Sequence, residues 1–174
     1  IASLRRVQER QYVSGGQSNI DVVAVAVREG VGVVQVFMIR DGQNLGNKTY
    51  YPAHTAGADD SQLLGAFLPQ FYLAGPTDRT VPVEILVNAP VPERELLEAA
   101  LADRAGRKTA ISQPVRGDRA RWLSMAVNNA QLALAQTLGA KSSAAARALA
   151  LGEALSLDEA PKRVECFDIS HTMG

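Results

Sequence analysis

The run Val22-Val-Ala-Val-Ala-Val27 predicts a strand that is buried on both faces of a sheet, because small and β-branched apolar residues follow one another without polar alternation. Arg28-Glu-Gly30 then turns the chain. A second apolar run, Val33-Val-Gln-Val-Phe-Met-Ile39, predicts a second strand, and Asp41-Gly42 is a strong hairpin signal before a third strand around Leu45 to Tyr51. The sequence therefore predicts an antiparallel meander of three strands.

Helical and strand patterns alternate after this meander. We first expect a helix between the cap candidates Asp59, Asp60 and Ser61 and the stop signal Gly75, and then a strand at Val83-Glu-Ile-Leu-Val87. A second helix is expected from Pro92 to Gly106, with Leu96, Leu97, Ala100 and Leu101 on one buried face. A short strand at Thr109-Ala-Ile111 and a long helix from Asp118 to about Leu138, which Gly139 ends, complete the order. This order, β-β-β-α-β-α-β-α, is that of a ribonuclease H-like fold. We therefore predict an α/β, ribonuclease H-like domain with a five-stranded mixed sheet and flanking helices over residues 20–140.

Two extensions flank the predicted domain. Residues 1 to about 11 have the pattern of a helix end, and Ser14-Gly-Gly-Gln-Ser-Asn19 breaks it as a polar linker. Residues 141–162 predict a helical linker with Ser142 and Ser143 as cap candidates, packed through Leu149, Leu151 and Leu155. The fold is thus expected to carry an N-terminal helix tail and a C-terminal extension.

The last twelve residues contain one carboxylate inside an apolar, strand-like run. Asp168 lies between Phe167 and Ile169 and is followed at once by the turn signal Ser170-His-Thr-Met-Gly174. An ionised group inside a buried strand costs several kcal/mol unless a cation or a hydrogen-bond network compensates it. Asp168 is therefore a candidate ligand for magnesium or manganese. An exposed edge-strand aspartate, or one that caps the next turn, explains the spacing equally well.

Several segments resemble the UvrC family of bacterial excision-repair nucleases. These segments are Glu165-Cys-Phe-Asp-Ile-Ser-His-Thr-Met-Gly174, Pro114-Val-Arg-Gly-Asp-Arg-Ala-Arg-Trp-Leu123 with Asn128-Asn-Ala130, Gln70-Phe-Tyr-Leu73, and Leu4-Arg-Arg-Val7 with Gln11-Tyr-Val13. They occur in the order of the family and cover nearly the whole chain. The resemblance implies a protein that incises damaged double-stranded DNA on both sides of a lesion by metal-dependent phosphodiester hydrolysis, with UvrB as its partner.

The resemblance also assigns roles to particular residues. Asp168 matches the first metal-binding carboxylate of the family's nuclease domain, so it is expected to be catalytic and to bind Mg or Mn. Residues 163–174 would be the first strand of that domain, and residues 1–14 the trailing end of a UVR-type helix, with UvrB binding mainly elsewhere. A lone aspartate cannot hold the two cations of such a site, which lie roughly 3.5–4 Å apart. We therefore expect this sequence to be an internal fragment that is inactive alone.

Residues 20–140 lack the acids that a ribonuclease H-like nuclease needs. Such an enzyme places carboxylates in the middle of strand one, on the first helix and at the end of strand four. Here strand one has valine and alanine in its middle and Asp21 only at its entrance, strand four ends at the neutral amide Asn88, and Asp59 and Asp60 read as solvent-facing caps. The prediction is a catalytically inactive domain for spacing, docking or positioning. The alternative for the whole chain is a non-catalytic docking or scaffold module that binds a repair partner or DNA.

A local cluster of cationic residues surrounds the start of the long helix expected from Asp118, in a chain whose formal net charge is zero. With no overall charge, any DNA contact must be local. The candidate DNA-binding residues are Arg107, Lys108, Arg116, Arg119 and Arg121, with Arg104 nearby. A solvated rim in which Asp103 and Asp118 provide local ion pairs is the alternative interpretation of the same residues.

Cysteine content and hydropathy indicate the compartment. The single Cys166 cannot form an internal disulfide, which favours a reducing cytoplasm. No apolar run reaches the roughly 18 residues of a membrane span, so no membrane partner is expected. His54 has no candidate metal ligand near it in sequence and is expected in a loop.

Overall fold

A computed structural model describes residues 19–40, 43–75 and 80–165. The chain forms two compact units, one up to Ala135 and one from Gln136 onward. The first unit contains the whole sheet and both hydrophobic cores. The buried carboxylate of the sheet and both pockets described below belong to the first unit.

Five strands form one mixed sheet in the order β3-β2-β1-β4-β5. Their bounds are Ile20–Arg28 for β1, Val31–Arg40 for β2, Gln43–Tyr50 for β3, Glu84–Val87 for β4 and Ala110–Ser112 for β5. Strands β1 to β3 pair antiparallel, whereas β4 pairs parallel to β1 and β5 parallel to β4. The predicted meander and the predicted five-stranded mixed sheet are both confirmed.

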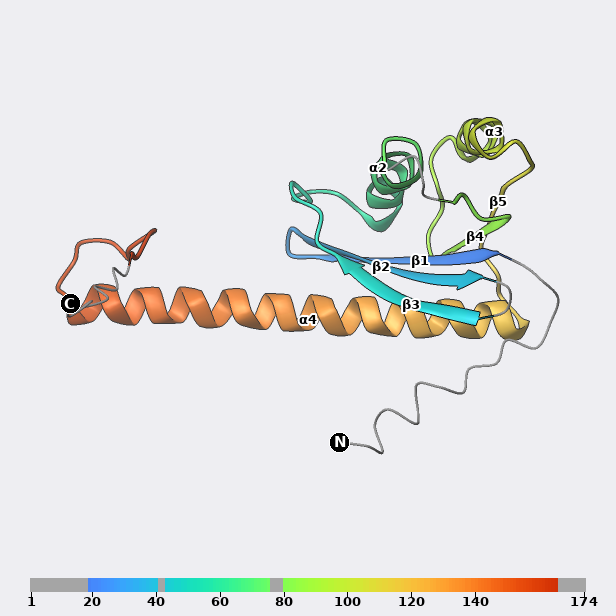
Figure 1. The fold of residues 1–174 in the computed structure, drawn as a ribbon. Helices are drawn as coiled ribbons and strands as arrows, with labels where there is room; N and C mark the ends of the chain where they lie inside the picture. Colours follow the sequence, from blue (N-terminus) through green and yellow to red (C-terminus); the bar gives the residue numbers. More distant parts are fainter. Residues whose placement is uncertain (1–18, 41–42, 76–79, 166–174) are drawn as a thin grey trace, which may run out of the picture. The chain divides into compact units, whose positions relative to one another are not determined.

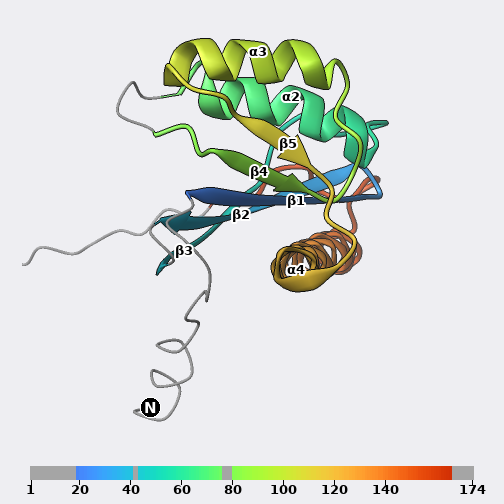
Figure 2. The ribbon, with the colours of Figure 1, turned by 90° about the vertical axis from the view of Figure 1, so that its right-hand side faces the viewer.

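Helices cover both faces of this sheet (Figures 1 and 2). Helices α2 (Asp60–Tyr72) and α3 (Arg94–Ala105) lie on one face, and the first part of α4 (Gly117–Ala154) lies on the other. Alternate residues of β1 enter different cores: Val23 and Val25 pack with residues of α2 and α3, while Val22 and Ala24 pack with residues of α4. This is the two-sided burial that the run of valines and alanines predicts.

Local signals explain where several elements begin. Asp59 caps α2 through a capping box, in which its side chain accepts from the Gln62 backbone N–H while the Gln62 side chain accepts from the Asp59 N–H. The turn between β1 and β2 has positive φ at both Glu29 (53°) and Gly30 (72°). Two consecutive positive φ angles match the twist of a tight hairpin, and glycine adopts one of them without strain.

The predicted buried face of α3 is wrong at one position. Leu97 and Leu101 are buried, but the side of the helix that carries Leu96 faces solvent, and Leu96 is 66% exposed. Residues four apart lie on one stripe of a helix, whereas adjacent residues point about 100° apart. Leu97 and Leu101 form the stripe toward the sheet, and Leu96 lies outside it.

The predicted helix end at Gly139 is also wrong, because α4 continues to Ala154 and includes Ser142 and Ser143 as interior residues. A glycine inside a helix costs only about 1 kcal/mol relative to alanine, and the alanines and leucines around it are strong helix formers. Leu149 and Leu155 are 58% and 60% exposed, which contradicts the expected packing through them. Although α4 is long, no helix in the described residues combines the length and apolarity needed to cross a membrane.

Candidate functional site

Asp21 is the buried carboxylate of the sheet, with an exposure of only 1%. It lies near the start of β1, where one side-chain oxygen (Oδ1) faces Arg40 at the end of β2 and the other (Oδ2) faces Tyr72 at the end of α2. The Arg40 Nη1 to Oδ1 distance is 2.5 Å, and the Tyr72 hydroxyl donates to Oδ2 at 2.6 Å. Both oxygens of the carboxylate therefore already accept hydrogen bonds from the protein.

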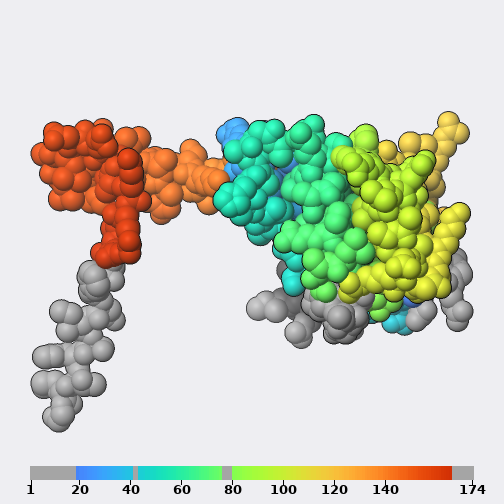
Figure 3. Space-filling model, turned by 90° about the horizontal axis from the view of Figure 1, so that it is seen from above, coloured from blue at the N-terminus to red at the C-terminus, as the bar shows by residue number. Residues whose placement is uncertain are grey.

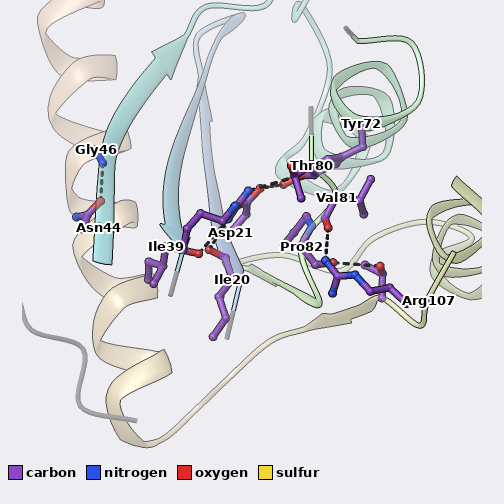
Figure 4. Close-up of polar contacts among 12 residues, drawn as sticks. Ile20, Asp21, Ile39, Asn44, Gly46, Tyr72, Thr80, Val81, Pro82 and Arg107 are labelled. Atoms are coloured by element: carbon purple, nitrogen blue, oxygen red, sulfur yellow. Dashed lines mark hydrogen bonds and ion pairs between the residues drawn. The ribbon is translucent and has the colours of Figure 1, made fainter. Parts of the chain in front are cut away.

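Arg40 is itself held by backbone carbonyl groups. Its guanidinium donates to the carbonyl oxygens of Ile20, Ile39 and Thr80 at 3.4, 3.0 and 3.5 Å. Figure 4 shows Asp21 and Tyr72 pointing toward each other beside Thr80. The cluster joins β1, β2, α2 and the segment before β4, so a metal could reach Asp21 only by displacing the partly buried guanidinium of Arg40.

The centre of β1 and the end of β4 contain no carboxylate. Val23 and Val25 occupy the middle of β1 and are fully buried. Asn88 follows β4, where its side-chain oxygen accepts from the Val25 N–H at 2.8 Å and its NH₂ group donates to the Val25 carbonyl at 2.9 Å. The amide thus extends the β1–β4 ladder by one step, a role that needs a donor and an acceptor together and that a carboxylate could not perform.

Asp59 and Asp60 at the start of α2 differ in their surroundings. Asp59 is exposed and is the helix cap, as predicted, whereas Asp60 is half-buried rather than solvent-facing. Burial raises the pKa of the Asp60 carboxyl, a hydrogen bond from the Val27 backbone lowers it, and the neighbouring Asp59 charge raises it further. Neither aspartate lies in a cluster: in the described residues, no group of three or more histidine, cysteine, aspartate or glutamate side chains could hold a metal ion.

The principal sequence candidate, Asp168, lies outside the described residues, as do His171 and Cys166. The catalytic and metal-binding roles expected of Asp168 therefore stay predictions. His54 is exposed in the loop between β3 and α2, as expected, and has a positive φ of 59°.

The predicted basic residues have different environments. Arg107 is half-buried and donates to the Val81 carbonyl at 2.8 Å (Figure 4), Arg119 pairs with Glu84 at 2.8 Å, and Arg121 pairs loosely with Asp118 at 3.6 Å. Lys108 and Arg116 are exposed. None of the ion pairs found in the described residues includes either of them. These two are the members of the set whose charge is available to an outside anion.

A second feature, which sequence reasoning did not identify, is a pocket lined by aromatic rings where the end of β3 meets α2. Its volume is about 290 Å³, and we call it the aromatic pocket; it is lined by Tyr50, Tyr51, Pro52, Phe67, Gln70 and Phe71. Lys48 lies over the Tyr50 ring, with its Nζ atom 5.1 Å from the ring centroid. The clustering of Lys48-Thr-Tyr-Tyr-Pro52 was the available signal.

A third feature is a groove between α2 and α3, which lie side by side on the face seen in Figure 3. Its volume is about 510 Å³, and we call it the helical groove; its lining includes Gly65, Pro69, Pro92, Glu93, Leu96 and Leu97. The exposed Leu96 therefore belongs to this groove.

A family model agrees with this architecture. Residues 19–137 match the family model described as "UvrC Ribonuclease H-like domain". Over its whole length the chain is 45% identical to the UvrABC system protein C of Serratia proteamaculans and 44% identical to that of Alcanivorax borkumensis, of which it covers 28% and 29%. Among solved structures, a ribonuclease H1 isolated from compost matches 67% of this chain and 99% of its own, with 17% identity and a TM-score of 0.35. The chain spans less than a third of the length of the two UvrABC system proteins C.

Proposed function

Because this chain belongs to the UvrC ribonuclease H-like domain family, we propose that the whole protein incises damaged double-stranded DNA in nucleotide excision repair, a cytoplasmic process. The proposed reaction is metal-dependent phosphodiester hydrolysis on both sides of a lesion. The support is the identity of about 45% along the entire chain with proteins named UvrABC system protein C. UvrB is the proposed partner, mainly through parts of the protein outside these residues.

Within that protein, we propose that the ribonuclease H-like domain makes no cut of its own. The observation that carries this proposal is the occupation of both Asp21 oxygens by Arg40 and Tyr72. The valines at the centre of β1 and the amide of Asn88 at the end of β4 support it, because they stand where such a nuclease needs carboxylates. The domain would then act as a scaffold that positions its neighbours.

The catalytic role falls to Asp168 in this proposal. Residues 163–174 would open the endonuclease domain, and Asp168 would be one ligand of a divalent cation, magnesium or manganese. The described residues do not fit such a cation, since they hold no cluster of three candidate ligands. Residues 1–14 would be the trailing end of a UVR-type helix and residues 141–162 a helical linker between domains.

We propose that the basic residues contact the DNA backbone and that they contribute unequally to its binding. Lys108 and Arg116 are exposed, so they are the first candidates for phosphate contact. Arg119 and Arg121 have carboxylate partners, and Arg107 is engaged with a backbone carbonyl. We therefore expect these three to contribute less than Lys108 and Arg116.

A docking module is the second candidate function. The helical groove favours it, because Leu96 is exposed beside an apolar lining of prolines and leucines. Exposed apolar patches of this kind mark many protein-protein contact sites. A docking role is compatible with the lack of nuclease activity proposed above, since a ribonuclease H-like domain that does not cut DNA can still bind a repair partner.

The proposal predicts that the 174-residue chain does not nick DNA. Purified chain incubated with supercoiled plasmid and either Mg²⁺ or Mn²⁺ should leave the plasmid supercoiled, because no described cluster can hold the cations. The whole protein, tested beside UvrB on lesion-bearing duplex, is the positive control. Metal-dependent relaxation of the plasmid by the chain alone would contradict the proposal that the ribonuclease H-like domain has no nuclease activity.

A further inference from the structure

The aromatic pocket consists of rings that are already fixed by the fold. The rings of Phe67 and Phe71 are stacked with centroids 5.1 Å apart and an interplanar angle of 22°. Tyr50 meets both of them, at centroid distances of 5.4 and 5.5 Å. Phe71 is only 7% exposed and belongs to the main core, so it anchors the group. A ligand that enters would find rings that need no reordering, which lowers the entropy cost of binding.

One ring of the pocket remains open to solvent. Tyr51 lines the pocket and is 59% exposed, although an aromatic residue of this size gains from burial. Aromatic faces of this kind are the surfaces on which unpaired nucleic-acid bases stack. Tyr51 therefore supplies an accessible face beside a rigid wall of rings.

The charges around the pocket favour an anionic ligand. None of its lining residues is acidic, and Gln70 adds an amide that can both donate and accept hydrogen bonds. Lys48 lies over the ring of Tyr50, one of the lining residues, and no ion pair of the described residues includes Lys48. The helical groove differs, because its lining contains the acidic Glu93 and no aromatic ring.

We propose that the aromatic pocket binds an unpaired base of single-stranded DNA, with the base against Tyr51 and the neighbouring phosphate near Lys48. Rings provide stacking for any base, Gln70 offers hydrogen bonds to a base edge, and Lys48 provides the single positive charge that a phosphate needs. The inference goes beyond incision, and it rests on the proposed function only for the choice of DNA as the nucleic acid. It holds whether or not the domain cuts DNA.

The test is binding of a short fluorescein-labelled oligothymidylate to the 174-residue chain, followed by fluorescence anisotropy in the presence of EDTA. Tyr51→Ala should weaken binding about tenfold, within the range that stacking on one aromatic residue contributes. Tyr51→Phe keeps the ring and should retain binding. Leu132→Ala is the matched control, because Leu132 is equally exposed at 60% but lies on α4.

Charge is tested by the salt dependence of the same binding. Lys48→Gln should weaken binding and reduce the slope of log K against log [salt] by about 0.7, the value for one phosphate contact on a single strand. Lys141→Gln is the matched control and should leave the slope unchanged, because Lys141 is an exposed lysine of α4 to which no DNA contact is assigned. Circular dichroism checks that each variant folds.

Three results would overturn the proposal: no binding of the oligonucleotide by the wild-type chain, equal binding by Tyr51→Ala and Leu132→Ala, or equal loss for Lys48→Gln and Lys141→Gln. Binding of a proline-rich peptide at Tyr51 in place of the oligonucleotide would also overturn it, in favour of a peptide site. EDTA excludes metal-dependent cleavage, so failure here is separable from failure of the proposed incision activity, which is measured on the whole protein.

Discussion

Asp168→Ala in the whole protein should lower incision of lesion-bearing DNA by on the order of 10²-fold or more, the scale on which removal of one charge-stabilising group lowers kcat. The reason is that a missing carboxylate ligand leaves a two-metal site unable to hold its cations in position. The measurement is the rate of incision on a labelled duplex with a single lesion, with UvrB present. Binding of the same duplex, followed by mobility shift, should be retained.

An acid of the ribonuclease H-like domain provides the control. Asp59→Asn removes a carboxylate beside the first helix but keeps a good N-cap, so the fold should be preserved. Incision by this variant should stay within about twofold of wild type if the domain is idle, a change of less than 0.5 kcal/mol in the barrier. Full-rate cutting by Asp168→Ala, or a large loss in Asp59→Asn, would reverse the assignment of the two domains.

Asp21→Ala should lower the free energy of unfolding by about 3–5 kcal/mol, because it leaves the Arg40 guanidinium partly buried without its carboxylate. This is a large fraction of the 5–15 kcal/mol that typical domains have in total. Tyr72→Phe removes one hydrogen bond to the same carboxylate and should cost about 1–3 kcal/mol. Urea unfolding of the 174-residue chain, followed by circular dichroism, measures both.

Asp118→Ala is the matched control for this pair of variants. Asp118 and Arg121 form an ion pair whose side chains are 65% and 78% exposed, and such pairs contribute only about 0–1 kcal/mol. If Asp21→Ala cost no more than Asp118→Ala, the buried cluster would not be the link between β1, β2 and α2 that its geometry indicates.

Patterns that are local in sequence predicted most of the fold. The valine-rich run of β1, the hairpin at Glu29-Gly30 and the cap at Asp59 each act within a few residues, and each is confirmed. The element order then led to the ribonuclease H-like fold, and the family model over residues 19–137 confirms it together with the family resemblance. The errors had two sources. The apolar repeat of α3 did not reveal which of its leucines the sheet would bury, and Leu96 lies outside the buried stripe. At Gly139, the helix propensity of the surrounding residues outweighed the stop signal.

The candidate site was less predictable, because its contacts join residues that are far apart in the chain. Asp21 was recognised as an acid at the entrance of strand one, but its partners Arg40 and Tyr72 lie 19 and 51 positions away. The hairpin register that pairs Ile20 with Ile39 places Arg40 next to Asp21, so the β2 partner could have been inferred by counting from the turn. Tyr72 could not, because the docking of α2 on the sheet determines its position.

The central claim is that the ribonuclease H-like domain holds no catalytic metal, since Arg40 and Tyr72 already occupy its buried acid. Electron paramagnetic resonance of Mn²⁺ mixed with the 174-residue chain in equal amounts tests this directly, because bound Mn²⁺ loses the signal of the free aqueous ion. The account predicts the full free-ion signal for the wild-type chain. A signal that falls in the wild-type chain, and is restored by Asp21→Asn but not by Asp168→Asn, would contradict it.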